Sequence, residues 1–291
     1  LVCIIAVAVI CFFLFKNGIP AMAEIGFFDF VFGMKWKPGN ELFGIFPMIL
    51  GSIYVTGGAI LVGVPVGILM AVFMAKFCPK NIYRFMKPMV DLLAGIPSVV
   101  YGWVGMLVLV PGIRKVFRVP DGASLLAAII VLAIMILPSI IKMSVTALDA
   151  VPKEYEDASL ALGATPVETY FKVSVPAAKS GIAAAVVLGV GRAIGEAMAI
   201  TLVSGSAVNI PLPFNSVKFL TTAIVSEMGY AADTHREVLF TIGLVLFVFI
   251  MVVNAVLSSF LKKGAKENEE SKSVQASFLF VRGFRDPRFV C

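Results

Sequence analysis

Long apolar runs, separated by short charged segments, dominate the pattern of the chain. A helix needs about 20 apolar residues to cross the hydrocarbon core of a bilayer, and runs of roughly that length recur along the sequence. The pattern predicts six membrane-spanning helices, at residues 1–15, 47–75, 88–111, 123–141, 181–204 and 238–261. No cleavage pattern of small residues follows the first run, so we expect the end of a truncated span rather than a signal peptide.

Composition and charge agree with a polytopic, all-α membrane protein, because 59% of the residues are apolar and only 14% are charged. Lysines and arginines concentrate in segments 76–87 and 142–180 and after the last span. The positive-inside rule therefore predicts that these segments and the N-terminus lie in the cytoplasm. Lysines beside spans also explain the net charge of +6 without nucleic acid.

Residues 151–178, which we call the elbow, form the longest well-charged segment between two spans. Charges at this density are too costly for hydrocarbon, so the segment must lie in water or against a protein. A glycine able to end one helix precedes a capping box that starts another, and a proline is expected to stop the second. These residues are Gly163, then Thr165 with Glu168, and Pro176. The predicted bend presents Leu160, Leu162 and Gly163 at its tip.

The spacing from Asp157-Ala158-Ser159 to Gly163 and on to Val175-Pro176 resembles the EAA loop of ABC-importer permeases. The resemblance implies a cytoplasmic loop that docks into a groove of an ATPase subunit. It assigns that contact to Asp157, Ala158, Ser159, Leu160, Leu162 and Gly163. The alternative is an amphipathic surface elbow without a partner, although helices this short are marginal without a surface to pack on.

Arg192 and Glu196 are charges inside the fifth predicted span, one helical turn apart and so expected on one face. Such charges persist where they face a protein interior or a watery pathway. In one interpretation the two charges neutralise each other and fix helix packing. In the other, Arg192 binds an anionic substrate and Glu196 orients the arginine. Gly191 with Gly195, and Gly63 with Gly67, are expected to be faces for close helix packing.

The stretch Gly95-Ile96-Pro97-Ser98 should break or kink the third span. Backbone N–H groups freed at the break and the Ser98 hydroxyl could then meet an oxyanion. A kink that only shapes packing remains the alternative.

Two segments, Ala94–Gly102 and Gly191–Ala199, resemble permeases of the phosphate-specific transport family. Residues 221–224 and 227–229 are closer to its PstC-like than to its PstA-like members. The resemblance covers roughly residues 47–261 and implies a substrate path at Arg192, Glu196, Ser98 and Tyr101.

The resemblance implies a MetI-like permease subunit of an ATP-driven phosphate importer in a prokaryotic cell membrane. Its expected partners are a homologous PstA-like permease, a PstB-like ATPase dimer, an extracytoplasmic phosphate-binding protein and the lipid bilayer. The chain lacks a P-loop, so ATP and Mg are expected on the ATPase rather than here. One histidine and scattered cysteines offer no metal or catalytic set, so an enzyme is not expected. The expected regions are 1–46 with the truncated span and outer loop, the permease core 47–261, and a cytoplasmic tail 262–291.

Two rival functions remain at this point. One is a permease for another oxyanion, such as molybdate or sulfate. The other is a passive channel, which the elbow disfavours because a channel needs no ATPase dock.

Overall fold

A computed structural model describes residues 2–256 and 259 of the chain. The N-terminal part contains α1 (Val2–Ile25), α2 (Phe27–Phe32) and a two-stranded antiparallel hairpin. The hairpin pairs β1 (Trp36–Lys37) with β2 (Leu42–Phe43) around the short helix η1 (Pro38–Asn40), with Trp36 opposite Phe43. The chain then enters α3 (Phe46–Val72), which the π-helical turn η2 (Phe73–Phe77) extends.

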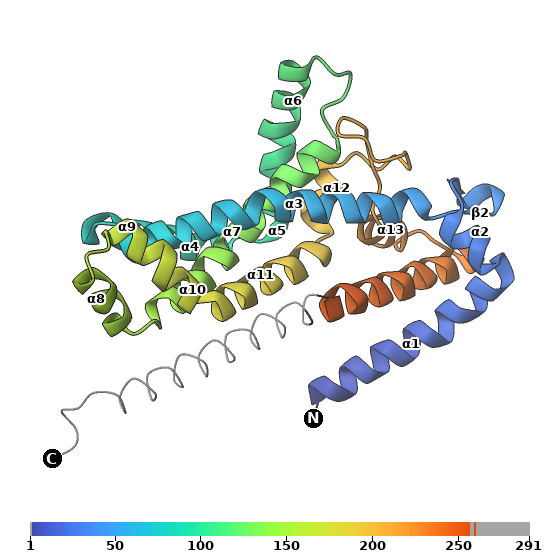
Figure 1. Cartoon of the computed structure of the whole chain (residues 1–291). Coiled ribbons are helices and arrows are strands. Elements are labelled where there is room, and N and C mark those ends of the chain that lie inside the picture. Colours follow the sequence, from blue (N-terminus) through green and yellow to red (C-terminus); the bar gives the residue numbers. More distant parts are fainter. Residues whose placement is uncertain (1, 257–258, 260–291) are drawn as a thin grey trace.

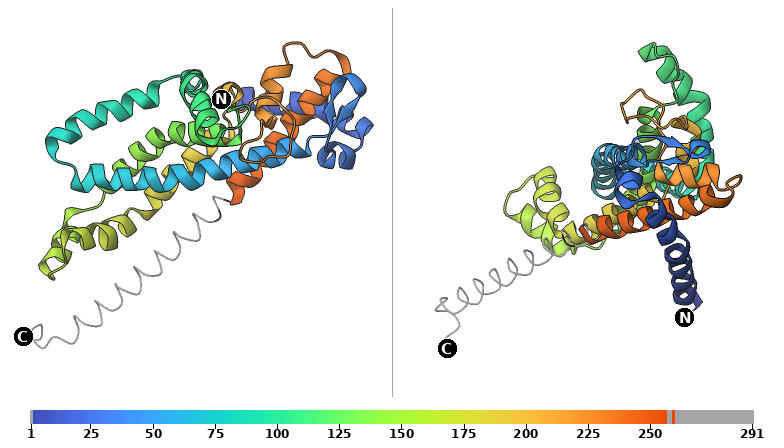
Figure 2. Two further views of the ribbon diagram at one scale, coloured as in Figure 1. Left: turned by 90° about the horizontal axis from the view of Figure 1, so that it is seen from above. Right: turned by 90° about the vertical axis from the view of Figure 1, so that its right-hand side faces the viewer.

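In the middle of the chain, one helix turns back along α3, and two further helical segments follow it. The elements of this part are α4 (Lys80–Gly95), α5 (Ser98–Val104), the π-helical turn η3 (Gly105–Leu109), α6 (Val110–Phe117) and α7 (Leu125–Asp149). Figure 2 shows α4 returning from the far end of α3, and Figure 1 shows α6 projecting from the side of the bundle.

The elbow and the last spans complete the chain. The elbow holds α8 (Lys153–Ala161), α9 (Pro166–Thr169), the π-helical turn η4 (Tyr170–Ser174) and α10 (Val175–Ala177). After it come α11 (Lys179–Ile194), α12 (Met198–Val203), α13 (Leu220–Glu227) and a final helix, Asp233–Val256.

The described residues contain five helices long and apolar enough to cross a membrane. They are Val2–Ile25, Phe46–Phe77, Ser98–Phe117, Leu125–Asp149 and Asp233–Val256. A sixth arises if Pro166–Ala177 and Lys179–Ile194, bent by 70°, count as one span. The predicted all-α, polytopic fold class is therefore confirmed. The predicted tail 262–291 and most of 257–261 lie outside the described residues.

All the predicted spans differ from the structure in their bounds; the fourth, for example, extends to Asp149 and the sixth begins at Asp233. Three others differ in kind. The third, 88–111, is wrong because it joins the end of amphipathic α4 to α5, and the chain breaks between them at Ile96 and Pro97. The fifth, 181–204, is interrupted after Ile194. The first continues to Ile25, so part of the expected outer loop 16–46 is helical.

The buried helix α7 organises the packing of the bundle. Small residues let its neighbours approach closely: a Cβ on Gly63 or Gly67 of α3 would lie 2.9 Å from Ile136 or Ile140 of α7. This confirms the predicted packing role of these two glycines. A Cβ at Gly191 would meet nothing within 4 Å, and one at Gly195 would meet only the backbone oxygen of Gly191, so no other helix of the described chain packs on this face and its packing role stays a prediction.

The bundle has two distinct ends, which α3 connects along its length (Figure 1). One, which we call the elbow end, carries α8 and α9. The other, which we call the opposite end, carries α2 and the β1–β2 hairpin. Each end has its own apolar cluster, around Leu148 and Ile182 at the elbow end and around Phe30, Met48 and Leu239 at the opposite end.

Candidate functional site

The predicted elbow is present, and its turn has the predicted causes. Gly163 adopts φ +89°, which favours glycine, and directly follows the turn that ends α8. Thr165 and Glu168 form the capping box that starts α9. The second helix continues through η4 and α10 and ends at Ala177, one residue after Pro176 and so close to the predicted end, and the chain bends by 70° before α11.

The tip of the elbow exposes apolar side chains. Leu162 is 90% exposed and Leu160 41% exposed, and a side chain at Gly163 would meet nothing within 4 Å. Asp157 and Ala158 are also exposed. Ser159 differs from the others, because its hydroxyl hydrogen bonds to that of Thr169 at 2.9 Å and joins α8 to α9. The tip is therefore suited to dock against another protein, with Ser159 as an internal brace.

A glutamate attaches the elbow to the end of α3. Glu156 Oε1 lies 2.6 Å from Lys76 Nζ and accepts a hydrogen bond from the Ser174 hydroxyl at 2.8 Å. Burial alone would raise the pKa of Glu156, but the bonds from Lys76 and Ser174 outweigh it and hold that pKa below its ordinary value. The rings of Phe77 and Tyr170 pack edge to face beside this anchor, with centroids 5.0 Å apart.

Glu196 stabilises a helix start instead of pairing with Arg192. The chain leaves the helix after Ile194, and the Ala199 N–H donates to Glu196 Oε1 at 2.8 Å at the first turn of α12. The backbone oxygen of Glu196 accepts a hydrogen bond from the Thr221 hydroxyl at 3.0 Å. The ion pairs of the described residues do not include Arg192 with Glu196. The expectation of one shared helical face is therefore wrong.

Arg192 instead contacts a residue that the sequence analysis missed. Its Nη1 donates to the Ser139 hydroxyl of α7 at 3.0 Å, and both residues are half-buried. A polar residue just after Pro138 in an otherwise apolar span was the available signal.

Ser98 and Tyr101 lie at the other broken span. The Tyr101 hydroxyl donates to the Leu93 backbone oxygen at 2.7 Å and so bridges the break between α4 and α5. Ser98 is half-buried at the first residue of α5, and the hydrogen bonds of the described residues do not include its hydroxyl.

The two broken spans meet at a small residue. Gly102 of α5 packs so tightly on α12 that a Cβ there would lie 2.6 Å from the Ala199 backbone oxygen. Ala199 is also the residue whose N–H binds Glu196. The start of α5, which carries Ser98, and the start of α12, whose Ala199 N–H donates to Glu196, therefore lie against each other.

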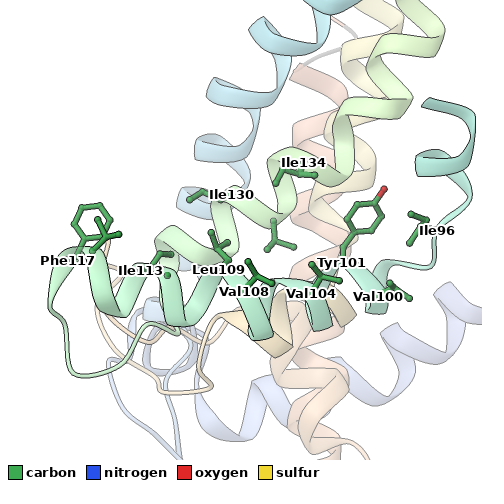
Figure 3. A pocket seen from close by; sticks show the side chains of 14 residues that line it. Ile96, Val100, Tyr101, Val104, Val108, Leu109, Ile113, Phe117, Ile130 and Ile134 are labelled. Carbon is green, nitrogen blue, oxygen red and sulfur yellow. The ribbon is translucent and has the colours of Figure 1, made fainter. Parts of the chain in front are cut away.

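A groove of about 650 Å³ runs between α5–α6 and α7 (Figure 3). Its lining includes Ile96, Val100, Val104, Ile130 and Ile134, and the Tyr101 hydroxyl is its polar side-chain group. An oxyanion needs donors that such a wall does not supply, so the groove is not itself an anion site.

A buried charge cluster at the opposite end was not predicted. Glu227 is bonded to the Lys218 ammonium group, and its Oε2 lies 2.7 Å from His235 Nε2. The Trp36 indole N–H donates to both carboxylate oxygens at 3.2 Å. We call Trp36, Lys218, Glu227 and His235 the outer cluster. Trp36 lies 191 positions before Glu227, and Lys218 and His235 lie nine and eight positions from it, so no local motif indicated this cluster.

Apolar helices long enough to cross a membrane, helix breaks at Ile96 and Pro97 and after Ile194 beside half-buried polar side chains, and a charged elbow are typical of a multi-pass membrane transport subunit. The chain belongs to the family of binding-protein-dependent transport system inner membrane components, whose model matches residues 63–263. It is therefore a transporter subunit and not an enzyme.

Relatives and solved structures agree with this family. The chain is 39% identical to the probable ABC transporter permease protein YqgH of Bacillus subtilis, over 87% of this chain and 85% of the relative. It is 34% identical to the phosphate transport system permease protein PstC of Mesorhizobium japonicum, over 84% and 80%.

Two solved transporters share the fold. A chain of the inward-facing MetNI methionine ABC transporter has a TM-score of 0.62 at 21% identity, covering 79% of this chain and 99% of that one. A chain of a bacterial alginate ABC transporter has a TM-score of 0.60 at 16% identity, covering 89% and 91%. At these identities the likeness concerns the fold alone.

Proposed function

We propose that this chain is a permease subunit of an ATP-driven importer of inorganic phosphate, which forms the translocation path together with a homologous PstA-like permease. The observation that carries the proposal is the arginine at the broken span. Arg192 is held by a neutral hydroxyl and not by Glu196, so its charge stays available to an anion. Relatives named as phosphate permeases support phosphate as that anion.

The path would be walled by Arg192, Glu196, Ser98 and Tyr101. A fixed cation with planar donors lowers the cost of stripping water from an oxyanion. Glu196 contributes indirectly, because its bond to Ala199 fixes the start of α12 beside α5. Tyr101 ties α4 to α5 across the break near Ser98.

The tip of the elbow would dock on a PstB-like ATPase dimer, which binds ATP and Mg on its own chains. An extracytoplasmic phosphate-binding protein would deliver the anion at the opposite end. Under this proposal the elbow and the N-terminus would lie in the cytoplasm of a prokaryotic cell. The lysines and arginines beside the elbow end support this orientation.

The rival anions share the chemistry of phosphate, since molybdate and sulfate are also tetrahedral oxyanions. They therefore enter the experiment as competing substrates. A passive channel would transport without ATP, and the exposed apolar tip of the elbow favours the driven transporter.

The test measures ATP-driven uptake of phosphate by liposomes that hold the assembled transporter and its binding protein. We expect Arg192→Gln to lower uptake by about tenfold or more, because hydrogen bonds to a charged group are lost at the barrier. Arg192→Lys should restore part of the uptake. Glu196→Gln should be milder, because the amide oxygen can still accept from Ala199.

The double change of Arg192 and Glu196 to glutamine separates the pathway from packing. Without an ion pair between them, the two effects should add, whereas a structural pair predicts recovery. Uptake restored in the double variant, or sulfate or molybdate imported in preference to phosphate, would contradict the proposal.

A further inference from the structure

The fixed neighbour of Arg192 is a neutral hydroxyl on a different helix. Ser139 of α7 accepts from Arg192 Nη1 at 3.0 Å, across 53 positions of sequence. Among the described residues, no carboxylate lies within ion-pair distance of this guanidinium. The arginine is thus oriented without being neutralised.

The two helices that carry this hydrogen bond are held at a short distance from each other. Gly189 lies one turn before Arg192 on α11 and packs on Ile140, the neighbour of Ser139. A Cβ at Gly189 would lie 2.8 Å from Ile140 Cγ1. Ile140 is itself fully buried in the core. The Ser139 hydroxyl is therefore presented to Arg192 from a rigid element, as a preorganised site requires.

The arrangement leaves hydrogen-bond donors available beside open space. A guanidinium only donates, so the Ser139 oxygen is the acceptor and its own proton remains available. The nearest acid in sequence, Glu196, has its Oε1 engaged by Ala199. A Cβ at Gly191, next to Arg192, would meet none of the described residues within 4 Å. N–H and O–H donors beside such an opening suit a tetrahedral oxyanion.

We infer that Ser139 is the positioning residue of Arg192: it holds the guanidinium toward the path and offers its own proton to the same oxyanion. The inference rests on the proposed function and deepens it. Without the hydroxyl, Arg192 keeps its charge but samples more rotamers, so each passage of the anion becomes slower. The amount of folded subunit should hardly change, because a half-buried side chain loses only one oxygen.

The transport test compares Ser139→Ala, Ser139→Thr and the control Ser144→Ala. Ser144 lies on the same helix, is fully buried, and its hydroxyl has no hydrogen-bond partner among the described residues. In assembled transporter in liposomes, Ser139→Ala should slow ATP-driven phosphate uptake by about tenfold. Ser139→Thr keeps the hydroxyl and should retain most of the uptake, and Ser144→Ala should leave it unchanged. Uptake by Ser139→Ala at the rate of Ser144→Ala would overturn the inference.

A second measurement does not depend on transport. Phenylglyoxal modifies arginine side chains, and mass spectrometry of the peptide that contains Arg192 gives the rate at this residue. In the assembled transporter, Ser139→Ala should speed this modification several-fold and weaken the protection given by inorganic phosphate, with sulfate as the comparison anion. Unchanged modification and protection in Ser139→Ala would overturn the inference.

The two measurements distinguish failure of this inference from failure of the proposed function. If Arg192→Gln lowers uptake and Ser139→Ala changes neither measurement, the inference falls and phosphate import stands. If the wild-type transporter imports no phosphate while Ser139→Ala still speeds the modification of Arg192, the proposed function falls and the positioning role is supported.

Discussion

The two ends of the molecule each hold a glutamate against a lysine, but with different numbers of partners. At the elbow end, Glu156 is bound by Lys76 and Ser174, and its side chain is 16% exposed. At the opposite end, Glu227 is bound by all three other members of the outer cluster, and its side chain is 5% exposed.

The two glutamates also differ in the segments that they join. Trp36 comes from the β1–β2 hairpin, Lys218 precedes α13, and His235 lies in the first turn of the last helix. Glu227 therefore joins the hairpin, the segment before α13 and the last helix through polar contacts. Glu156 ties α8 only to the end of α3 and to η4. At the opposite end a buried glutamate joins several segments, whereas the ion pair of the elbow joins it to the end of α3 alone.

The largest expected effect on folding comes from Glu227→Gln. The change leaves Lys218 buried without an acid, and breaking a buried pair in this way typically costs about 3–5 kcal/mol. We expect a strong fall in the amount of folded subunit recovered from membranes and in its melting temperature in detergent. Both quantities can be measured without partner subunits.

Glu237→Gln is the matched control for this change. Glu237 lies on the final helix, two residues after His235, and is exposed, so the control should cost at most a few tenths of a kcal/mol. Equal recovery of the two variants would show that the outer cluster does not hold the opposite end together.

A smaller effect is expected at the other anchor, from Glu156→Gln. The pair is only partly buried, so we expect about 1 kcal/mol of stability to be lost, with near-normal amounts of subunit. Uptake of phosphate should fall several-fold, because the elbow loses its ion pair to α3. Lys76→Gln should have a similar effect, and the double change should lose less than the sum of the two.

Glu154→Gln provides the control for the anchor, since Glu154 lies on the same helix and is exposed. If Glu154→Gln and Glu156→Gln lower uptake equally, the net charge of α8 matters and the contact with Lys76 does not. The contrast with Glu227 would then concern the opposite end alone.

The same two ends differ in how far the sequence predicted them. The elbow was predictable because its causes lie within a few consecutive residues: Gly163 provides the left-handed turn, and Thr165 with Glu168 provides the cap. The outer cluster was not predictable, because Trp36 and Glu227 are 191 positions apart and nothing local joins them.

The candidate pathway lies between these extremes. The break at Gly95–Ser98 was predicted from its glycine and proline, but apolar content alone assigned the end of α4 to the span. The shared face of Arg192 and Glu196 assumed an unbroken helix, and the helix ends before Glu196. Arg192 contacts Ser139 instead. This contact depends on how α7 and α11 pack, and the pattern of apolar positions does not determine which residues of two helices meet.

The smallest effect on folding, with the sharpest effect on transport, is expected from Gly163→Asp at the tip of the elbow. The position faces open space and has φ +89°, a conformation that aspartate tolerates better than most residues. The subunit should therefore fold and remain in the membrane at near-normal amounts. An aspartate beside Leu162 would place a charge without a partner in the apolar contact with the ATPase, and uptake of phosphate should be blocked.

Gly163→Asn separates charge from shape at this tip, because asparagine has nearly the same size and the same tolerance of the left-handed turn. It should retain clearly more uptake than Gly163→Asp. Both variants are to be compared for ATPase subunit retained on purification and for uptake in liposomes. Normal uptake by Gly163→Asp with the ATPase still bound would contradict docking at the tip. The contact between Glu156 and Lys76 would then not serve to couple the elbow to the ATPase.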